Sequence, residues 1–133
     1  MKFYQKEISL PTFHRGFHLV TDLILDSIPE LHKIELGQLK VFIKHTSRSM
    51  KINENADPDV CSDIINKLNK MVALNDGYKH AEGNSAAHIK ASLMGFSVSV
   101  IVEGGKLQLG TWQGIYFAEF DGARNRKVWV KSV

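Results

Sequence analysis

Residues 97–120 read SVSVIVEGGKLQLGTWQGIYFAEF, and this stretch decides the fold class. Runs in which apolar and polar residues alternate are typical of half-buried strands, and the Gly104-Gly105 pair between two such runs predicts a turn. Residues 127–133 resume the same pattern after a short polar break. We therefore expect strands over 97–102, 106–110, 115–120 and 127–133. The second half of the chain is predicted to be mainly β-structure.

Two helices are predicted to precede these strands. Asp57-Pro58 is the clearest helix start, because Asp is a favoured N-cap and Pro is favoured at the first helical position. Apolar residues then recur at helical spacing over the next turns. A shorter helix is expected to begin at Asn84 or Ser85 and to end at Gly95, since glycine is the usual residue just beyond a helix end.

The first part of the chain mixes strands with one more helix. Thr21-Asp22 predicts a helix cap, and Pro29 limits the helix that follows. Strands are expected over 2–10, 14–20 and 38–45. This order predicts an α+β fold: one compact domain over residues 1–133, mostly antiparallel sheet with two or three helices.

Composition excludes several classes of protein. The chain is 44% hydrophobic and 23% charged, as expected for a globular domain. Its net charge of +3 is spread over scattered Lys and Arg residues, so a nucleic-acid partner is not expected. The single cysteine allows no internal disulfide and no paired-cysteine metal site. Without an apolar signal core or a run long enough to span a membrane, no membrane partner is expected and the expected location is cytoplasmic.

Three polar segments interrupt the otherwise apolar, strand-like sequence. They are HTSRS at 45–49 continuing to NEN at 53–55, HAEGNSAAH at 80–88, and LGTWQG at 109–114. Polar groups near a core must be paired, because each unpaired buried group costs roughly 1–3 kcal/mol. Such a concentration therefore indicates either a buried hydrogen-bond network or a functional site.

Histidines are the strongest candidates for chemistry in these segments. Imidazoles are common ligands for Zn²⁺ and common acid–base groups, so His45, His80 and His88 are the candidate metal ligands. Glu54 and Glu82 could orient an imidazole or act as a general base. The alternatives are that each histidine bonds to backbone and that Glu54 serves only its own turn. The remaining histidines look like surface or core-edge residues: His14, His18 and His32.

Candidate substrate-binding residues lie in the same segments. Gly83, Asn84 and Ser85 open a helix, and backbone N–H groups there suit an anion such as phosphate. Trp112 could stack on a heteroaromatic ring that Gln113 hydrogen-bonds, although a Trp in such a segment is more often an anchor in a core or an interface. A serine nucleophile is disfavoured, because no GxSxG turn is present.

The motifs together resemble one family. They are RGFHLVTD at 15–22, HTS at 45–47, INENADP at 52–58, EG at 82–83, HIK at 88–90, LMG at 93–95 and LGTWQGI at 109–115. From these motifs the chain is identified as a member of the YjbQ-like family, a group of uncharacterised proteins also labelled secondary thiamine-phosphate synthase. The resemblance covers essentially the whole chain.

This resemblance implies compact α+β subunits that assemble as homotrimers, with polar motifs lining a site near subunit boundaries. The label implies joining a pyrimidine methyl diphosphate to a thiazole phosphate with loss of pyrophosphate, assisted by Mg²⁺. The motif residues carried over are His45, Ser47, Asn53, Glu54, His80, Glu82, His88, Trp112 and Gln113. One departure is the segment between Gly83 and His88, where the commoner pattern is two residues longer and contains an acidic pair and a Met-Pro.

Our hypothesis is therefore a small cytosolic, trimeric, enzyme-like protein with a histidine-lined site for a phosphorylated heterocycle. His45, Glu54 and Glu82 are the expected catalytic groups, with a divalent ion, Zn²⁺ or Mg²⁺, as cofactor. The expected substrate-binding residues are Ser47, Asn53, Gly83, Asn84, Ser85, Trp112 and Gln113. The alternatives are a metabolite- or metal-binding protein without catalysis and a metal-dependent hydrolase.

Overall fold

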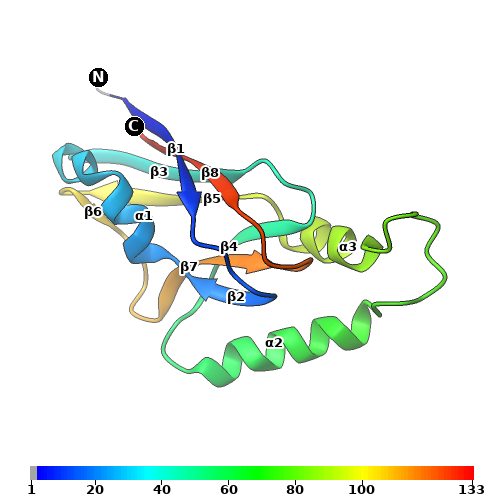
Figure 1. Ribbon diagram of the computed structural model, residues 1–133. Helices are drawn as coiled ribbons and strands as arrows, with labels where there is room; N and C mark the ends of the chain where they lie inside the picture. Colours follow the sequence, from blue (N-terminus) through cyan, green and yellow to red (C-terminus); the bar gives the residue numbers. More distant parts are fainter. Residues whose placement is uncertain (1–2) are drawn as a thin grey trace.

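The structure, a computed structural model, describes residues 3–133 (Figure 1). Its strands are β1 (Tyr4–Leu10), β2 (Gly16–Leu19), β3 (Leu36–Ile43), β4 (Arg48–Glu54), β5 (Ser97–Glu103), β6 (Lys106–Leu107), β7 (Gln113–Glu119) and β8 (Arg126–Ser132). Its helices are α1 (Thr21–Ser27), α2 (Pro58–Met71) and α3 (Ser85–Met94), with a 3₁₀-helix, η1 (Pro29–Lys33).

The strands form two antiparallel sheets. One has five strands in the order β1-β8-β3-β5-β6, and the other has three in the order β2-β7-β4. In the larger sheet β8 lies between β1 and β3, so the first and last strands of the described chain are neighbours. In the smaller sheet β7 is central, and Arg48 pairs with Glu119 at one end while Glu54 pairs with Gln113 at the other. The α+β class and the mostly antiparallel pairing are confirmed.

The hydrophobic core lies between the two sheets. Alternate residues of β3, Leu39, Val41 and Ile43, are fully buried, as the period-2 pattern requires. They belong to one apolar cluster with Ile115 and Phe117 of β7. Helix α1 and the residue after it close one end of this cluster through the buried side chains of Ile24 and Ile28.

Helices α2 and α3 lie beside the three-stranded sheet, away from the five-stranded sheet, and form a third layer (Figure 1). Asp57 caps α2 as predicted, because its carboxylate accepts a hydrogen bond from the Asp59 backbone N–H at 2.9 Å. Helix α3 docks on β4, where the Ser49 hydroxyl donates to the Ala91 carbonyl at 3.1 Å. In contrast, α2 has a single buried residue, Leu68, and therefore covers the sheet loosely.

Several local expectations differ from the structure. The sequence does not predict strand β4, because its many polar residues hide the strand pattern. Thr21 lies inside α1 rather than capping it, and its hydroxyl accepts from the Ile115 N–H instead. The expected strand over 38–45 is β3, which ends at Ile43 and leaves His45 in the following loop. Lys2, the first residue of the strand expected over 2–10, lies outside the described residues.

No helix within residues 3–133 combines the length and the apolar character needed to cross a membrane.

Candidate functional site

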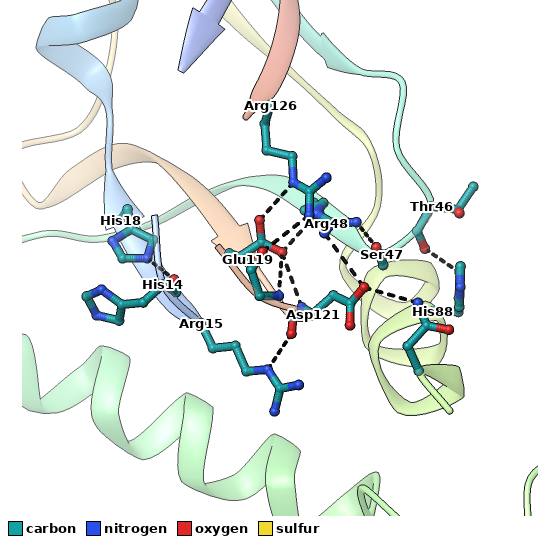
Figure 2. Close-up of polar contacts among 12 residues, drawn as sticks. His14, Arg15, His18, Thr46, Ser47, Arg48, His88, Glu119, Asp121 and Arg126 are labelled. Atoms are coloured by element: carbon teal, nitrogen blue, oxygen red, sulfur yellow. Dashed lines mark hydrogen bonds and ion pairs between the residues drawn. The ribbon is translucent and has the colours of Figure 1, made fainter. Parts of the chain in front are cut away.

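The β3–β4 loop meets α3 at one end of the three-stranded sheet, and a histidine holds the two together (Figure 2). The Nδ1 atom of His88 lies 3.1 Å from the carbonyl oxygen of Thr46. A carbonyl oxygen can only accept, so Nδ1 carries the hydrogen. The Nε2 atom of the neutral ring therefore has a free lone pair, which can accept a proton or bind a metal.

A second imidazole lies against the first. The ring centroids of His80 and His88 are 5.4 Å apart and their planes are nearly perpendicular at 86°. The Glu82 carboxylate lies 3.9 Å from Nε2 of His80, and both of these side chains reach solvent. The segment before α3 and the first turns of that helix thus bring three of the predicted residues together.

His45 lies in the β3–β4 loop, one residue before Thr46. Partial burial, followed by the positive charge of Arg48, lowers the pKa of His45 below its usual value, although the charge of Glu119 opposes this shift. The neutral form of His45 is therefore favoured at neutral pH. Within residues 3–133 no group of three His, Cys, Asp or Glu side chains is arranged to hold a metal ion, so His45, His80 and His88 do not form a three-histidine centre in the single chain.

A buried charge network supports this end of the sheet (Figure 2). Glu119 of β7 is 0% exposed, and its two carboxylate oxygens contact the Nε atoms of Arg48 at 2.8 Å and of Arg126 at 3.0 Å. The Asp121 carboxylate adds a second negative charge, 3.7 Å from the Arg48 guanidinium. Two cations and two anions therefore balance one another at this end of the molecule.

Two of the predicted substrate-binding residues form hydrogen bonds with members of this network. The buried hydroxyl of Ser47 accepts a hydrogen bond from the Arg48 guanidinium. The side-chain amide of Asn84 donates to the Asp121 carboxylate at 3.1 Å and does not cap α3. These side chains therefore stabilise the loop and the start of α3. Gly83 precedes Asn84 with a positive φ of 76°, which only glycine adopts without strain.

Ser85 is the first residue of α3, whereas Glu54, Trp112 and Gln113 lie at the opposite end of β4 and β7. The Glu54 carboxylate accepts hydrogen bonds from the backbone N–H groups of Ala56 and Asp57 at 3.2 and 2.9 Å. These bonds correspond to the alternative interpretation, in which Glu54 serves its own turn. The side chain of Gln113 accepts from the Gly110 N–H at 2.9 Å. Trp112 is 62% exposed and so is not a core anchor of this chain.

Tyr116 lies next to this second group on the helix-facing side of β7. Its hydroxyl donates to the carbonyl of Glu54 at 3.0 Å. Burial, with a contribution from Cys61, raises the pKa of Tyr116 to about 12. Asn53 contacts the same cysteine, with its amide nitrogen 3.5 Å from the sulfur. These contacts join β4, β7 and α2.

The strand register separates the two groups of candidate residues. Arg48 pairs with Glu119 near the histidines, and Glu54 pairs with Gln113 six residues further along. At about 3.3 Å per residue, the two ends are about 20 Å apart. One subunit therefore does not bring Trp112 and Gln113 to His80 and His88.

The residues that organise the histidine end are not evident from the sequence. Arg48, Arg126 and Asp121 are not among the predicted residues, yet they hold the loop that carries Thr46. A signal is present at Arg48, which occurs in the HTSRS motif at the start of a strand with buried positions. Its partners are far away in the sequence and carry no comparable signal.

Comparison with known proteins places these observations in a family. The family model described as "UPF0047 protein YjbQ-like" matches residues 6–133. The chain is 48% identical over 114 residues to the UPF0047 protein MJ1081 of Methanocaldococcus jannaschii, covering 86% of this chain and 82% of that protein. It is 44% identical over 119 residues to the UPF0047 protein YjbQ of Salmonella typhimurium, covering 87% and 86% of the two chains.

A solved structure agrees with the fold throughout. A crystal structure of an uncharacterized conserved protein of the YjbQ/UPF0047 family from Clostridium acetobutylicum superposes with a TM-score of 0.90 at 52% sequence identity. The match covers 96% of this chain and 99% of the other.

Proposed function

This chain belongs to the YjbQ-like UPF0047 family, and we propose that it is a small enzyme-like protein that acts on a phosphorylated heterocycle through the His80–His88 pair. The reaction that we propose joins a pyrimidine methyl diphosphate to a thiazole phosphate. In it a C–N bond forms as the thiazole nitrogen attacks the methylene carbon, the C–O bond breaks, and pyrophosphate leaves with the electron pair.

The observation that carries this proposal is the fixed tautomer of His88. Its Nδ1–H is held by the Thr46 carbonyl, so Nε2 is ready to accept a proton or to bind a cation. The same orientation is typical of histidines that ligate metals, which usually donate their other N–H to a backbone carbonyl or carboxylate. The second imidazole, with its centroid 5.4 Å away, could supply a further nitrogen ligand.

We assign the roles by position. His80 and His88 hold a divalent ion, and the ion would stabilise the charge that develops on the departing pyrophosphate. Glu82 orients His80 or moves a proton, because its carboxylate lies 3.9 Å from that ring. Two nitrogen donors favour Zn²⁺ over Mg²⁺, which prefers oxygen ligands. Further ligands would come from a neighbouring subunit or from solvent.

We further propose a homotrimer, which would complete the site. The exposed Trp112 of one subunit would form a wall of the pocket that contains the histidines of the next, since the two lie at opposite ends of β4 and β7 within one subunit. Exposed apolar side chains on the outer face of the large sheet, Leu36 and Ile101, support association. Light scattering should give three times the 15.0 kDa subunit mass. A mass of one subunit across micromolar concentrations would contradict this assembly.

Metal analysis and activity measurements test the proposal together. We expect the purified protein to bind Zn²⁺, and His88→Ala and His80→Ala to lose it. The matched control is His32→Ala, since His32 is an exposed histidine whose ring contacts a local carbonyl. Glu82→Gln should lower turnover of the two thiamine precursors by about 10²-fold, the scale of a lost acid–base group. Equal metal content and equal turnover in all variants would refute the assignment.

A metal-binding protein without catalysis is the second candidate, favoured by the same paired imidazoles. Zinc binding that depends on His80 and His88, without turnover of the thiamine precursors or of simple phosphate esters, would establish it. Hydrolysis of phosphate esters that stops with a chelator would instead identify a metal-dependent hydrolase.

A further inference from the structure

A cavity of about 450 Å³ lies between β2, α2 and α3, on the helix-covered side of the small sheet. We propose that this cavity binds a small organic anion: a phosphate or carboxylate attached to an apolar, ring-sized body. The volume lies within the range of small-molecule sites and is much larger than a bare phosphate requires. None of the residues assigned above to metal or substrate binding lines it.

The walls of the cavity suit an apolar body. Phe17 of β2 and Phe120, which follows β7, contribute aromatic rings, while α2 contributes Ile65 and Leu68. Ligand pockets typically combine such apolar walls with a few polar groups that fix the ligand's orientation. Since Leu68 is the single buried residue of α2, a bound ligand would provide the apolar contact that this helix otherwise lacks.

Two cations at the cavity lack an anionic partner. The Nε atom of Arg15 donates to the backbone carbonyl of Asp121 at 2.6 Å, and the Lys90 ammonium donates to the side-chain carbonyl of Asn69 at 2.6 Å. Both acceptors are neutral. Within residues 3–133 neither cation has a carboxylate at ion-pair distance, although both line the cavity. An anion placed between them would gain charge-assisted hydrogen bonds from both.

The protonation of Lys90 agrees with this arrangement. Partial burial, followed by the positive charge of Arg15, lowers the pKa of the Lys90 ammonium. Both residues line the same cavity, so an anion bound there would offset this repulsion. Among the described residues that line the cavity, the one acidic side chain is Glu119, whose oxygens are already paired with Arg48 and Arg126. The uncompensated charge at the cavity is therefore positive.

The cavity is separate from the histidine pair. Ala86 and Lys90 of α3 line the cavity, whereas His88 reaches the β3–β4 loop. Each residue turns an α-helix by about 100°, so the His88 side chain leaves the helix about 160° away from those of Ala86 and Lys90. The anion site thus lies on the other side of α3 and does not depend on the proposed chemistry of His80 and His88.

The test uses 1-naphthyl phosphate, which combines a two-ring apolar body with a phosphate. Calorimetric titration of the full chain should show saturable binding of this probe. Its affinity should be at least about tenfold higher than that of 1-naphthol, which lacks the charge, or of inorganic phosphate, which lacks the body. A parallel titration with 1-naphthoate decides whether phosphate or carboxylate is preferred. Equal affinity for 1-naphthol and 1-naphthyl phosphate would overturn the anion site.

Variants locate the binding. Arg15→Gln and Lys90→Gln should each weaken 1-naphthyl phosphate binding about tenfold or more, while Lys90→Arg, which keeps the charge, should retain most of it. The matched controls are Arg124→Gln and Lys67→Gln, since both residues are exposed and lie outside the cavity lining. Circular dichroism checks that each variant is folded.

Two results would overturn the proposal at this stage. One is unchanged affinity in folded Arg15→Gln and Lys90→Gln proteins. The other is a change in subunit association without a change in probe affinity, which would identify the cavity face as an interface between copies of this chain. His88→Ala should bind the probe normally, so failure of the histidine assignment and failure of the anion site remain distinguishable.

Discussion

Replacing Glu119 with glutamine should strongly destabilise the protein. The change keeps the size of the side chain and removes the charge that faces Arg48 and Arg126 at 2.8 and 3.0 Å. The Glu119 carboxylate also accepts from the backbone N–H groups of Asp121 and Gly122 at 3.2 and 3.3 Å. All these partners are donors, so the NH₂ group of the substituted side chain would face a donor wherever it points.

The size of the effect follows from burial. The Glu119 side chain is 0% exposed and both arginine side chains are 6% exposed, so water cannot replace the lost charge. Removing one partner of a buried ion pair costs about 3–5 kcal/mol, because the other charge stays buried and unpaired. At a typical urea dependence of about 2 kcal/mol per molar, the midpoint of unfolding should fall by about 2 M.

Urea titration measures this change in the midpoint of unfolding. All variants are compared at one protein concentration, because subunit association also contributes to stability. The matched control is Glu103→Gln, since Glu103 is an exposed glutamate at the end of β5 that should lose less than about 0.5 kcal/mol. Adding Arg126→Met to Glu119→Gln should recover part of the loss by removing one unpaired cation. A Glu119→Gln midpoint within about 0.3 M of the wild type would refute the reasoning.

Three further predictions concern single groups. In the unfolded chain His45 has the usual pKa of about 6.5, whereas the fold lowers the pKa of His45. The free energy of unfolding should therefore fall as pH drops below about 6.5. Urea titration at several pH values should show a less steep fall in His45→Gln. Asp57→Ala should cost about 1 kcal/mol in the same titration at pH 7, because it removes the α2 cap on Asp59. Tyr116→Phe should cost about 1 kcal/mol by leaving the Glu54 carbonyl without its donor, and it should abolish the tyrosine absorbance change with a pKa of about 12. An unchanged value in any of these would contradict the contact concerned.

Local signals in the sequence were sufficient for much of the fold. Asp57-Pro58 locates the start of α2 because the N-cap and the first helical turn are determined by neighbouring residues. Gly95 marks the end of α3 for a similar reason: its positive φ of 93° favours glycine. Strand β4 is not predictable from local sequence, because its polar residues Arg48 and Ser49 are buried. Their partners, Glu119 and the Ala91 carbonyl, are distant in the sequence.

The candidate site was predictable only in part. His80, Glu82 and His88 are near one another in the sequence, so their clustering could be anticipated. Trp112 and Gln113 look equally polar and motif-like, yet the antiparallel register of β4 and β7 places them at the other end of the sheet. Register depends on which strands pair, and no local pattern encodes it. The Arg15–Lys90 cavity likewise forms only when β2 and α3 come together.

The pairing of β1 with β8 has a consequence for how the chain folds. Tyr4 pairs with Ser132, so β1 reaches its only sheet partner after nearly the whole described chain has been synthesised. Closing such a long loop costs entropy before any stabilising contact between the two strands forms, so topologies of this kind fold slowly. During synthesis on the ribosome β1 would remain unpaired until β8 is made. In that interval β1 could bind a chaperone or pair incorrectly. Moving residues 4–10 behind β8 by circular permutation should shorten this wait and speed refolding.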